Sequence, residues 1–397
     1  MSIKKKWCIA VVPGDGIGSE VMSATLGALE VLRMEGELDL TWTELGWPST
    51  AWHQGHGVMM PADGLQQLRS YDAILLGALG DPGPQSDPNR YVVTDGISLA
   101  PLLEIRKGFD LWACERPARL FKGAQQYLAD PRAREVDMLV IRENSEGEYV
   151  NQGGRLHRGT PFEIATQVEV FSRHATERLI RHAFYRAQQR LEERRLGLRA
   201  ARAFTDDRGG ESQAQVCLIT KRNALPHWGE LYCEVFAEIA QEFPEIALHH
   251  ELVDAACMKF VQCPWKFDVV VASNLQGDIL TDLAAVLSGG MGVASSSNVN
   301  PADRTMPPLF EPTHGSAPDI AGKNLADPRA MILTAANMLD WMGVEDCAAA
   351  EAANQLRQAV EQDLDKTYEL ARSTSETGRS IVAILQGALT VGANPES

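Results

Sequence analysis

The stretch Val269-Val-Val-Ala-Ser273-Asn274-Leu-Gln-Gly-Asp278-Ile-Leu-Thr-Asp282 decides the fold class of this chain. Its first five residues form a short apolar run typical of a buried strand. Polar residues follow at once, and Asp278 and Asp282, four residues apart, share one face if a helix begins here. Functional groups just past a strand end are typical of α/β proteins. The stretch therefore predicts an α/β fold.

The same alternation continues along the chain. Strands are predicted at residues 7–12, 73–76, 138–141, 216–220 and 269–273. Helices are predicted at residues 19–34, 173–195, 226–242 and 346–370, where apolar residues recur every three or four positions. A chain of 397 residues is too long for one core, because single cores stop growing near ~250–300 residues. We therefore expect two lobes.

Composition excludes several classes of function. Hydrophobic residues make up 45% of the chain and charged residues 23%, as in soluble proteins, and no apolar run reaches the ~18 residues of a membrane span. The net charge of −16 argues against nucleic-acid binding, which needs clustered Lys and Arg. The basic run at residues 190–202 is expected to be a solvated helix end and a mobile loop, and residues 197–215 a polar surface loop. Seven cysteines without a CxxC pair indicate a reduced, cytoplasmic setting.

The two carboxylates on the predicted helix, Asp278 and Asp282, suggest a metal site. Like charges at this spacing repel, so keeping both at the mouth of a buried strand favours a compensating cation. Mg²⁺ and Mn²⁺ take carboxylate oxygens and tolerate substrate oxygens as further ligands. A solvated helix face is the alternative interpretation of these two residues alone.

Cationic and proton-moving side chains also lie beside predicted strand ends. Arg106, Arg116 and Arg142 present guanidinium groups that match carboxylates bidentately, which suits an anionic diacid. Surface ion pairs are the alternative for each of them. Tyr149 and Lys221, each one step past a strand, are candidates for an acid and a base. Either is also explained as an ordinary half-buried side chain.

Two glycine-bearing segments are candidates for cofactor binding. Pro13-Gly-Asp-Gly-Ile-Gly18 lacks the GxGxxG spacing, so a tight strand-to-helix turn and a phosphate contact both remain open. The stronger candidate is Glu311-Pro-Thr-His-Gly-Ser-Ala-Pro-Asp-Ile-Ala-Gly-Lys-Asn324. It combines a histidine, an acidic residue and small residues that expose the backbone.

Taken in order, these pieces resemble the β-decarboxylating dehydrogenases of isopropylmalate, isocitrate, D-malate and tartrate. The resemblance covers nearly the whole chain, and residues 274–282 and 314–320 are its most specific parts. It implies a two-lobed, isopropylmalate dehydrogenase-like fold distinct from the Rossmann fold. Residues 1–110 and 288–397 would form the large cofactor-binding lobe. Residues 111–287 would form the smaller lobe, which makes a homodimer whose active sites are shared between subunits.

The resemblance also implies roles for individual residues. Asp278 and Asp282, with Asp254 of the partner subunit, would hold Mg²⁺ or Mn²⁺. The substrate, a small hydroxy diacid, would be bound by Arg106, Arg116, Arg142, Asn223, Ser98 and Leu102. Lys221 would take the hydroxyl proton as hydride passes to the nicotinamide, and Tyr149 would return a proton after loss of carbon dioxide. Cofactor contacts would come from His314, Gly315, Ser316, Ala317, Asp319, Asn324 and Asp327.

Asp319 bears on the choice of cofactor. A carboxylate at this place accepts hydrogen bonds from the ribose hydroxyls of NAD and repels the extra phosphate of NADP. The sequence therefore predicts NAD.

The substrate is predicted from the segment Asp95-Gly-Ile-Ser98-Leu99-Ala-Pro-Leu102, which lines the substituent pocket in the resembling family. Its Ser-Leu pair is closest to the D-malate and tartrate branch, so we expect one of these substrates or a 3-substituted malate. Alternatives are 3-isopropylmalate, or isocitrate with Ser98 donating to a third carboxylate; Ser98 is also a candidate helix cap. A non-catalytic regulatory subunit is the alternative from another class, although the aspartates, Lys221 and Tyr149 are all present.

Two positions and one segment depart from the family pattern. Glu115 places an acid next to Arg116, Asp327 stands where Asn is common, and Ser375-Glu-Thr-Gly378 replaces the usual segment near the end of the chain.

Overall fold

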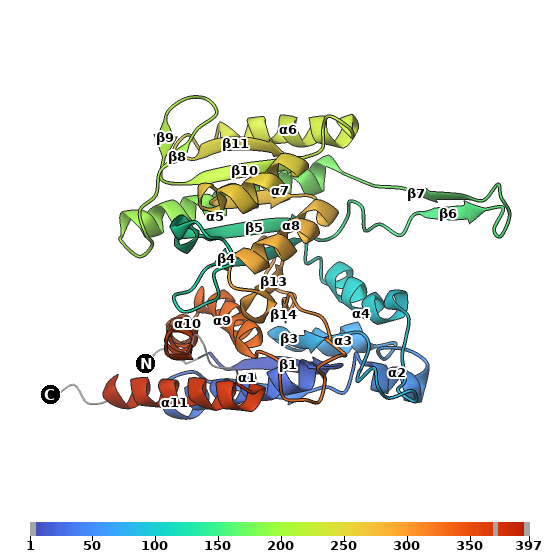
Figure 1. Ribbon diagram of the computed structural model, residues 1–397, viewed down its shortest axis with the longest axis vertical. Coiled ribbons are helices and arrows are strands. Elements are labelled where there is room, and N and C mark those ends of the chain that lie inside the picture. The colour runs from blue at the N-terminus through green and yellow to red at the C-terminus, as the bar shows by residue number, and fades with distance from the viewer. Residues whose placement is uncertain (1–4, 368–371, 393–397) are drawn as a thin grey trace. The chain divides into compact units, whose positions relative to one another are not determined.

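Figure 1 shows the computed structural model, which describes residues 5–367 and 372–392. The chain divides into two compact units. Unit 1 consists of Met1–Leu111, Leu120–Ala129 and Ser288–Ser397, and unit 2 of Trp112–Arg119 and Asp130–Leu287. Each unit is built on its own set of neighbouring strands covered by helices.

Unit 1 has the strand order β13-β14-β3-β1-β2. The strands are β1 (Trp7–Gly14), β2 (Leu40–Glu44), β3 (Ala73–Ala78), β13 (Ser295–Val299) and β14 (Leu309–Pro312). β1 pairs in parallel with β2 and β3, and β14 in parallel with β3, whereas β13 runs antiparallel to β14. The buried, continuously apolar β1 and β3 are typical of parallel strands covered on both faces.

The helices of unit 1 are α1 (Gly18–Glu35), α2 (Thr50–His56), α3 (Gly64–Leu68), α4 (Asp95–Gly108), η3 (Met291–Val293), α9 (Arg329–Gly343), α10 (Cys347–Thr367) and α11 (Thr374–Gly392). α9 is buried almost all round because it lies between the strands and the helices α1 and α10. A cluster that includes Ile74, Leu76, Ile105 and Phe109 packs α4 onto the strands. The last residues of the helix predicted at 346–370 lie outside the described residues.

Unit 2 has the strand order β11-β10-β12-β5-β4. Its strands are β4 (Ala113–Arg119), β5 (Asp137–Glu143), β10 (Gln215–Thr220), β11 (Ala247–Leu252) and β12 (Val269–Ala272), with two hairpins formed by β6 (Gly153–Leu156) and β7 (Ile164–Gln167), and by β8 (Phe204–Thr205) and β9 (Glu211–Ser212). The five main strands are parallel except for β4, which is antiparallel to β5. Their carboxyl ends therefore meet at one edge, where β5, β10, β11 and β12 all lead into the predicted site residues.

The helices of unit 2 are η1 (Pro131–Glu135), α5 (Arg173–Arg195), α6 (Pro226–Ala240), α7 (Val253–Gln262), η2 (Pro264–Lys266) and α8 (Asn274–Leu287). Adjacent residues of β4 show how two of them are placed: Glu115 contacts His182 of α5, and Arg116 contacts Asp278 of α8. Because consecutive strand residues point to opposite faces, α5 and α8 cover opposite faces of the sheet.

These elements confirm the predicted α/β class and every predicted strand and helix, with small changes at their ends. All seven cysteines lie in the described part of the chain, and none of them forms a disulfide. Within the described part of the chain, no helix is both long and apolar enough to cross a membrane.

The prediction for the basic run was wrong for Arg190 and Arg194. Arg190 and Arg194, at the end of α5, are each only 5% exposed and both bind the buried carboxylate of Asp268, at 2.6 and 2.7 Å. Burial would raise the pKa of Asp268, but the two guanidinium groups lower it below its ordinary value. These two arginines therefore form an internal ion-pair network with a distant part of the chain, whereas residues 195–198 are exposed, as predicted.

The segment at 197–215 is also more ordered than predicted. Instead of one loop, it forms the β8–β9 hairpin, in which Phe204 is paired with Ser212 and is buried. The guanidinium carbons of Arg194 and Arg202 lie 5.4 and 5.0 Å from the centre of the Phe204 ring. These cation–π contacts anchor the segment on the end of α5.

Candidate active site

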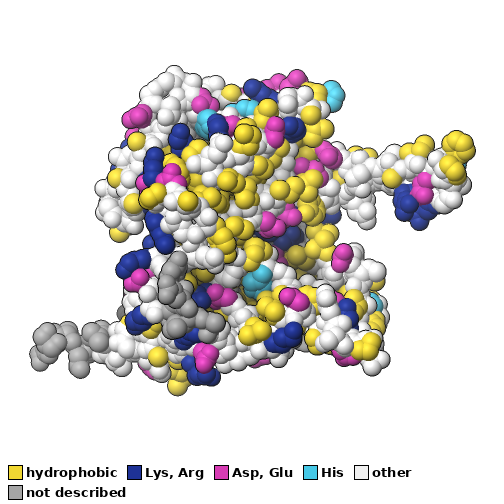
Figure 2. Space-filling view, viewed as in Figure 1, with side chains coloured by type: hydrophobic (Ala, Val, Ile, Leu, Met, Phe, Trp, Pro, Cys, Tyr) yellow, Lys and Arg dark blue, Asp and Glu magenta, His cyan; other side chains and the backbone are white. Residues whose placement is uncertain are grey.

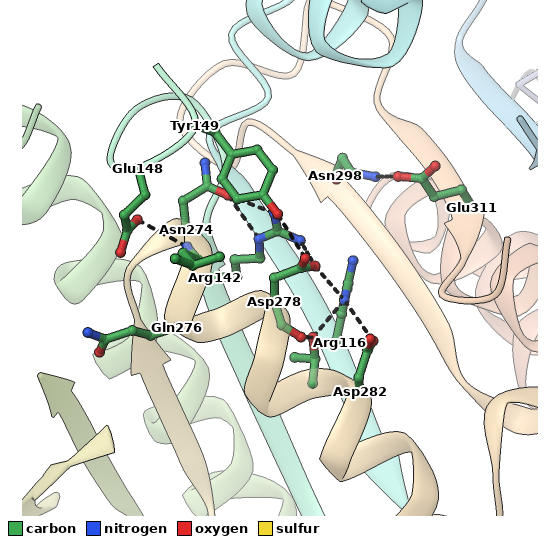
Figure 3. Close-up of polar contacts among 12 residues, drawn as sticks. Arg116, Arg142, Glu148, Tyr149, Asn274, Gln276, Asp278, Asp282, Asn298 and Glu311 are labelled. Atoms are coloured by element: carbon green, nitrogen blue, oxygen red, sulfur yellow. Dashed lines mark hydrogen bonds and ion pairs between the residues drawn. The ribbon is translucent and has the colours of Figure 1, made fainter. Parts of the chain in front are cut away.

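Five predicted residues of unit 2 meet at the start of α8, as Figure 3 shows. Arg142 Nη1, at the end of β5, contacts Asp278 Oδ1. Tyr149 Oη donates to Asp278 Oδ2 at 2.9 Å, and Arg116 Nη1 donates to Asp278 Oδ1 at 3.3 Å. Arg116 Nη1 also lies 3.9 Å from Asp282 Oδ1. The structure thus brings two arginines, one phenol and two carboxylates together.

Close packing of α8 on β5 makes this cluster possible. A Cβ at Gly277 would lie 2.8 Å from Cβ and Cγ of Arg142, so a larger residue would push the helix away from the strand. The amide of Asn274 then reaches the same arginine: its Oδ1 accepts from Arg142 Nε at 3.0 Å and Nη2 at 2.7 Å. Its Nδ2 donates to the carbonyl of Glu146 at 2.9 Å.

Asn274 is a residue of this cluster that sequence reasoning missed. Its side chain holds the buried Arg142 in place without carrying charge, and a neutral amide gives no electrostatic signal in a sequence. Only its position, directly after β12 and before two aspartates, pointed to a role.

Electrostatics at the cluster favour a bound cation and a protonated phenol. Burial and the Asp278 carboxylate raise the pKa of Asp282, although Arg116 opposes the shift. Burial, followed by the Asp278 charge, also raises the pKa of Tyr149. A divalent cation would relieve the repulsion between the two aspartates, which offer hard oxygen ligands. The donor set therefore fits Mg²⁺ or Mn²⁺.

The third predicted metal ligand lies elsewhere in unit 2. Asp254 lies in the first turn of α7, which follows β11, and Lys221 follows the neighbouring strand β10; their side chains pair at 2.7 Å. This contact lowers the pKa of Asp254. Asn223 is exposed in the turn after Lys221. β12 separates these strands from β5, and the described residues contain no group of three His, Cys, Asp or Glu side chains suited to one metal ion.

The predicted substrate residues of unit 1 lie on α4. Arg106 is 5% exposed, and its Nη2 donates to Glu311 Oε1 at 2.6 Å. Leu102 packs on the apolar cluster under the helix. Ser98 is inside α4, and its hydroxyl donates to the carbonyl of Asp95 at 3.1 Å. The helix-cap interpretation of Ser98 was wrong, because Thr94 holds the cap position.

The predicted cofactor segment follows β14 in unit 1. His314 Nδ1 lies 3.0 Å from the Gly315 carbonyl, and its buried Nε2 has no partner among the described residues. Burial lowers the pKa of His314, so the ring is neutral and Nε2 is an acceptor when Nδ1 donates. Asp319 is exposed, and Ala317 adopts a positive φ of 42°. An orphaned acceptor beside an exposed backbone turn fits a nucleotide.

Residues 13–18 pack against that turn and contact the carbonyl of Ser316. Gly16 takes a positive φ of 58°, and a Cβ there would lie 2.0 Å from the carbonyl oxygen of Ser316. The Ile17 N–H donates to the same carbonyl at 2.9 Å. Packing against the cofactor segment is therefore enough to explain the glycine at position 16, whereas a phosphate contact stays untested.

The remaining predicted cofactor residues are Asn324 and Asp327. Asn324 contacts one of the departures from the family pattern, Ser375, and Asp327 is itself a departure. Both ends of the Asn324 amide bind Ser375, with Nδ2 donating to its Oγ at 3.0 Å and Oδ1 accepting from its N–H at 2.9 Å. Asp327 forms an ion pair with Arg329 at 2.9 Å.

Glu115, which also departs from the family pattern, faces away from the arginine cluster. Its carboxylate lies 2.6 Å from His182 Nε2 and 3.3 Å from Arg186 Nε, both on α5. Burial alone would raise its pKa, but Arg186 and His182 lower it to about 2. The acid next to Arg116 is thus neutralised on the opposite face of β4.

Comparison with known proteins decides the family. The family model described as isocitrate/isopropylmalate dehydrogenase matches residues 8–381. The chain belongs to this family. A 3-isopropylmalate dehydrogenase of Thermobifida fusca is 40% identical over 94% of this chain and 96% of the relative. The decarboxylating D-malate dehydrogenase of Escherichia coli is 40% identical over 89% of this chain and 90% of its own length.

Further family members give the same picture. A probable tartrate dehydrogenase/decarboxylase of Agrobacterium vitis is also 40% identical, over 87% of this chain and 88% of its own length. The crystal structure of isocitrate dehydrogenase from Methylococcus capsulatus matches with a TM-score of 0.75 and 29% identity, over 96% of this chain and 99% of that chain. The predicted resemblance and fold are confirmed, and identity alone does not separate the branches of the family.

Proposed function

We propose that the chain catalyses the NAD- and divalent-metal-dependent oxidative decarboxylation of a 2-hydroxy diacid of the malate class. The observation that carries the proposal is the cluster of Arg116, Arg142 and Tyr149 around Asp278 and Asp282 on α8. Guanidinium groups beside hard carboxylate ligands can hold an anionic substrate next to a cation.

Asp278 and Asp282 would hold Mg²⁺ or Mn²⁺ together with Asp254 of the partner subunit. A bound divalent cation stabilises negative charge on a substrate oxygen as a Lewis acid. Among the described residues of a single chain, no group of three His, Cys, Asp or Glu side chains is suited to one metal ion, so a second copy would supply the third ligand. The same copy would supply Lys221 and Asn223.

The proton transfers fall to Lys221 and Tyr149. Lys221 Nζ accepts the hydroxyl proton as the substrate is oxidised, with bound NAD supplying the hydride acceptor. Tyr149 Oη donates the proton that completes the product after carbon dioxide leaves. The phenol is protonated at neutral pH, as a proton donor must be, and burial raises its pKa further. Arg106, Arg116 and Arg142 orient the substrate carboxylates.

NAD would bind along residues 314–327. His314 Nε2 offers an acceptor to the cofactor, and the small residues Gly315, Ser316 and Ala317 let the nucleotide approach the backbone. The exposed Asp319 carboxylate accepts from the ribose hydroxyls and disfavours the extra phosphate of NADP. Asn324 and Asp327 complete the contacts.

A homodimer is proposed because unit 2 exposes two apolar surfaces. One is the β6–β7 hairpin, whose apolar side chains are visible in Figure 2 and include Leu156 and Phe162, 60% and 79% exposed. An isolated two-stranded hairpin is marginally stable in water. The other surface lies on the contacting helices α7 and α8 and includes Met258 and Ile279, 61% and 54% exposed. Exposed patches of this kind mark interfaces.

The α4 helix favours an apolar substituent on the substrate. Ile97 and Leu99 are each 39% exposed there, whereas the Ser98 hydroxyl is used within the helix. A 3-alkylmalate is therefore the second candidate beside D-malate and tartrate, and isocitrate, with its third carboxylate, is disfavoured. Since all the proposed acid, base and metal residues are present, a purely regulatory subunit is also disfavoured.

A spectrophotometric screen for NADH formation tests the proposal. It covers D-malate, the tartrates, 3-isopropylmalate, isocitrate and other 3-alkylmalates with Mn²⁺, with and without EDTA. We expect turnover of a malate-class diacid that EDTA abolishes. No turnover with any of these diacids, or turnover unaffected by EDTA, would refute the proposed reaction.

A further inference from the structure

Three glutamates in the segment 142–149, Glu143, Glu146 and Glu148, each accept hydrogen bonds from backbone N–H groups of unit 2. Glu143 accepts from the backbone N–H groups of Ser145 and Glu146, so it folds the segment on itself. Glu146 and Glu148 instead reach out to two different helices. Tyr149, the proposed proton donor, ends the segment.

Glu146 and Glu148 make matching contacts. Glu146 accepts from the N–H of Ser172 at 2.6 Å and from its Oγ at 2.9 Å, and Ser172 caps the start of α5. Glu148 accepts from the Ser273 Oγ at 2.6 Å and from the N–H of Leu275 at 3.0 Å, at the start of α8. Each carboxylate thus binds one backbone N–H and one serine hydroxyl at a helix start.

The contact at α8 is energetically favourable for two reasons. The first N–H groups of a helix have no partner within the helix, and the Leu275 N–H is one of these. An anion there is also stabilised by the helix dipole. Ser273 is fully buried, and its Oγ also accepts from the Gln276 N–H at 3.4 Å. Glu148 therefore completes the cap of α8 from outside the helix.

The same segment makes a second contact with α8, one helical turn further on, through Tyr149. Tyr149 Oη donates to Asp278 at 2.9 Å, three residues after Leu275, which binds Glu148. Figure 3 labels Glu148, Tyr149 and Asp278. Two adjacent residues thus bind one helical turn at two points. Rotation of this turn would move the Asp278 carboxylate relative to the phenol and to Arg142.

We propose that Glu148 is a positioning residue that fixes the first turn of α8 and so aims Asp278 and Asp282. It acts on the helix through Ser273 and Leu275. The inference rests on the proposed function in one respect, namely that these two aspartates are the metal ligands.

The test compares Glu148→Gln with Glu146→Gln as a matched control. Glutamine keeps the volume but loses the charge and one acceptor oxygen. Hydrogen–deuterium exchange of the full-length protein should show faster exchange over residues 273–282 in Glu148→Gln alone. In Glu146→Gln, faster exchange should be confined to the start of α5. This readout needs neither metal nor substrate.

The kinetic readout is the KM for Mn²⁺. We expect Glu148→Gln to raise it about tenfold, as for residues that orient metal ligands, with the KM for NAD unchanged. Ser273→Ala, which removes one of the two contacts, should shift the KM for Mn²⁺ in the same direction by less. It keeps the test informative if Glu148→Gln fails to fold.

Unchanged α8 exchange in Glu148→Gln, or equal effects of Glu146→Gln and Glu148→Gln on the KM for Mn²⁺, would overturn the inference. Failure of the proposed function gives a different pattern. Asp278→Asn would then keep the wild-type KM for Mn²⁺, whatever the exchange of α8 shows.

Discussion

Replacing Asn274 by alanine tests how the site holds its most buried arginine. Arg142 is 2% exposed, and two of its guanidinium nitrogens bind Asn274 Oδ1 at 3.0 and 2.7 Å. A hydrogen bond to a charged group contributes about 1.5–3 kcal/mol. Because Arg142 keeps its contact with Asp278, we take the lower figure for each bond, which gives about 3 kcal/mol in total.

At about 1.4 kcal/mol per factor of ten, this loss corresponds to a fall of roughly 100-fold in kcat/KM. The assay is steady-state NADH formation with the best substrate of the screen, and circular dichroism checks the fold of the variant.

Asn337→Ala is the matched control for this change. Asn337 is likewise a helical asparagine, though only partly buried, and its Oδ1 accepts from an arginine, Arg357, at 3.3 Å, but it belongs to no contact of the proposed site. We expect its kcat/KM to stay within about threefold of wild type, since a change of this size is under 1 kcal/mol. A well-folded Asn274→Ala variant with activity equal to this control would refute the reasoning.

Three further predictions concern stability and cofactor choice. Asp268→Ala strands two buried guanidinium groups and should lower the free energy of unfolding by about 3–5 kcal/mol in urea titrations; a loss under about 1 kcal/mol, typical of exposed ion pairs, would contradict the buried network. Glu115, with its folded pKa lowered to about 2, should add stability above its unfolded value near 4.5. That stability should vanish as the pH falls from 4.5 towards 2, so the stability difference between wild type and Glu115→Gln should shrink over this window. Asp319→Ala should lower kcat/KM for NAD and raise it for NADP, and an unchanged ratio would remove this residue from the cofactor site.

The sequence predicts the main strands and helices because short apolar runs and apolar residues at helical spacing are local signals. The helix Arg173–Arg195 was predicted with its exact bounds from such spacing alone. Site candidates followed from the same logic, since Tyr149, Lys221 and Asp278 each come just after a strand in an α/β chain.

What could not be predicted depends on partners far away in the chain. Arg190 looked solvated because its partner Asp268 is 78 positions away, and no local pattern links the two. From the sequence, Glu115 is next to Arg116 and would be expected to pair with it. In the strand, however, its side chain points to the opposite face, where it contacts His182. The contact between the neutral amide of Asn274 and Arg142 could not be predicted either, because an uncharged side chain gives no charge pattern in the sequence.

Carbon dioxide release by the double variant Asp278→Asn, Asp282→Asn tests the central claim most directly. The account predicts that this variant folds like the wild type but releases no measurable carbon dioxide or NADH from the preferred diacid with saturating Mn²⁺, because amides are poor ligands for a hard cation compared with carboxylates. Carbon dioxide release at the wild-type rate by the folded variant would contradict it.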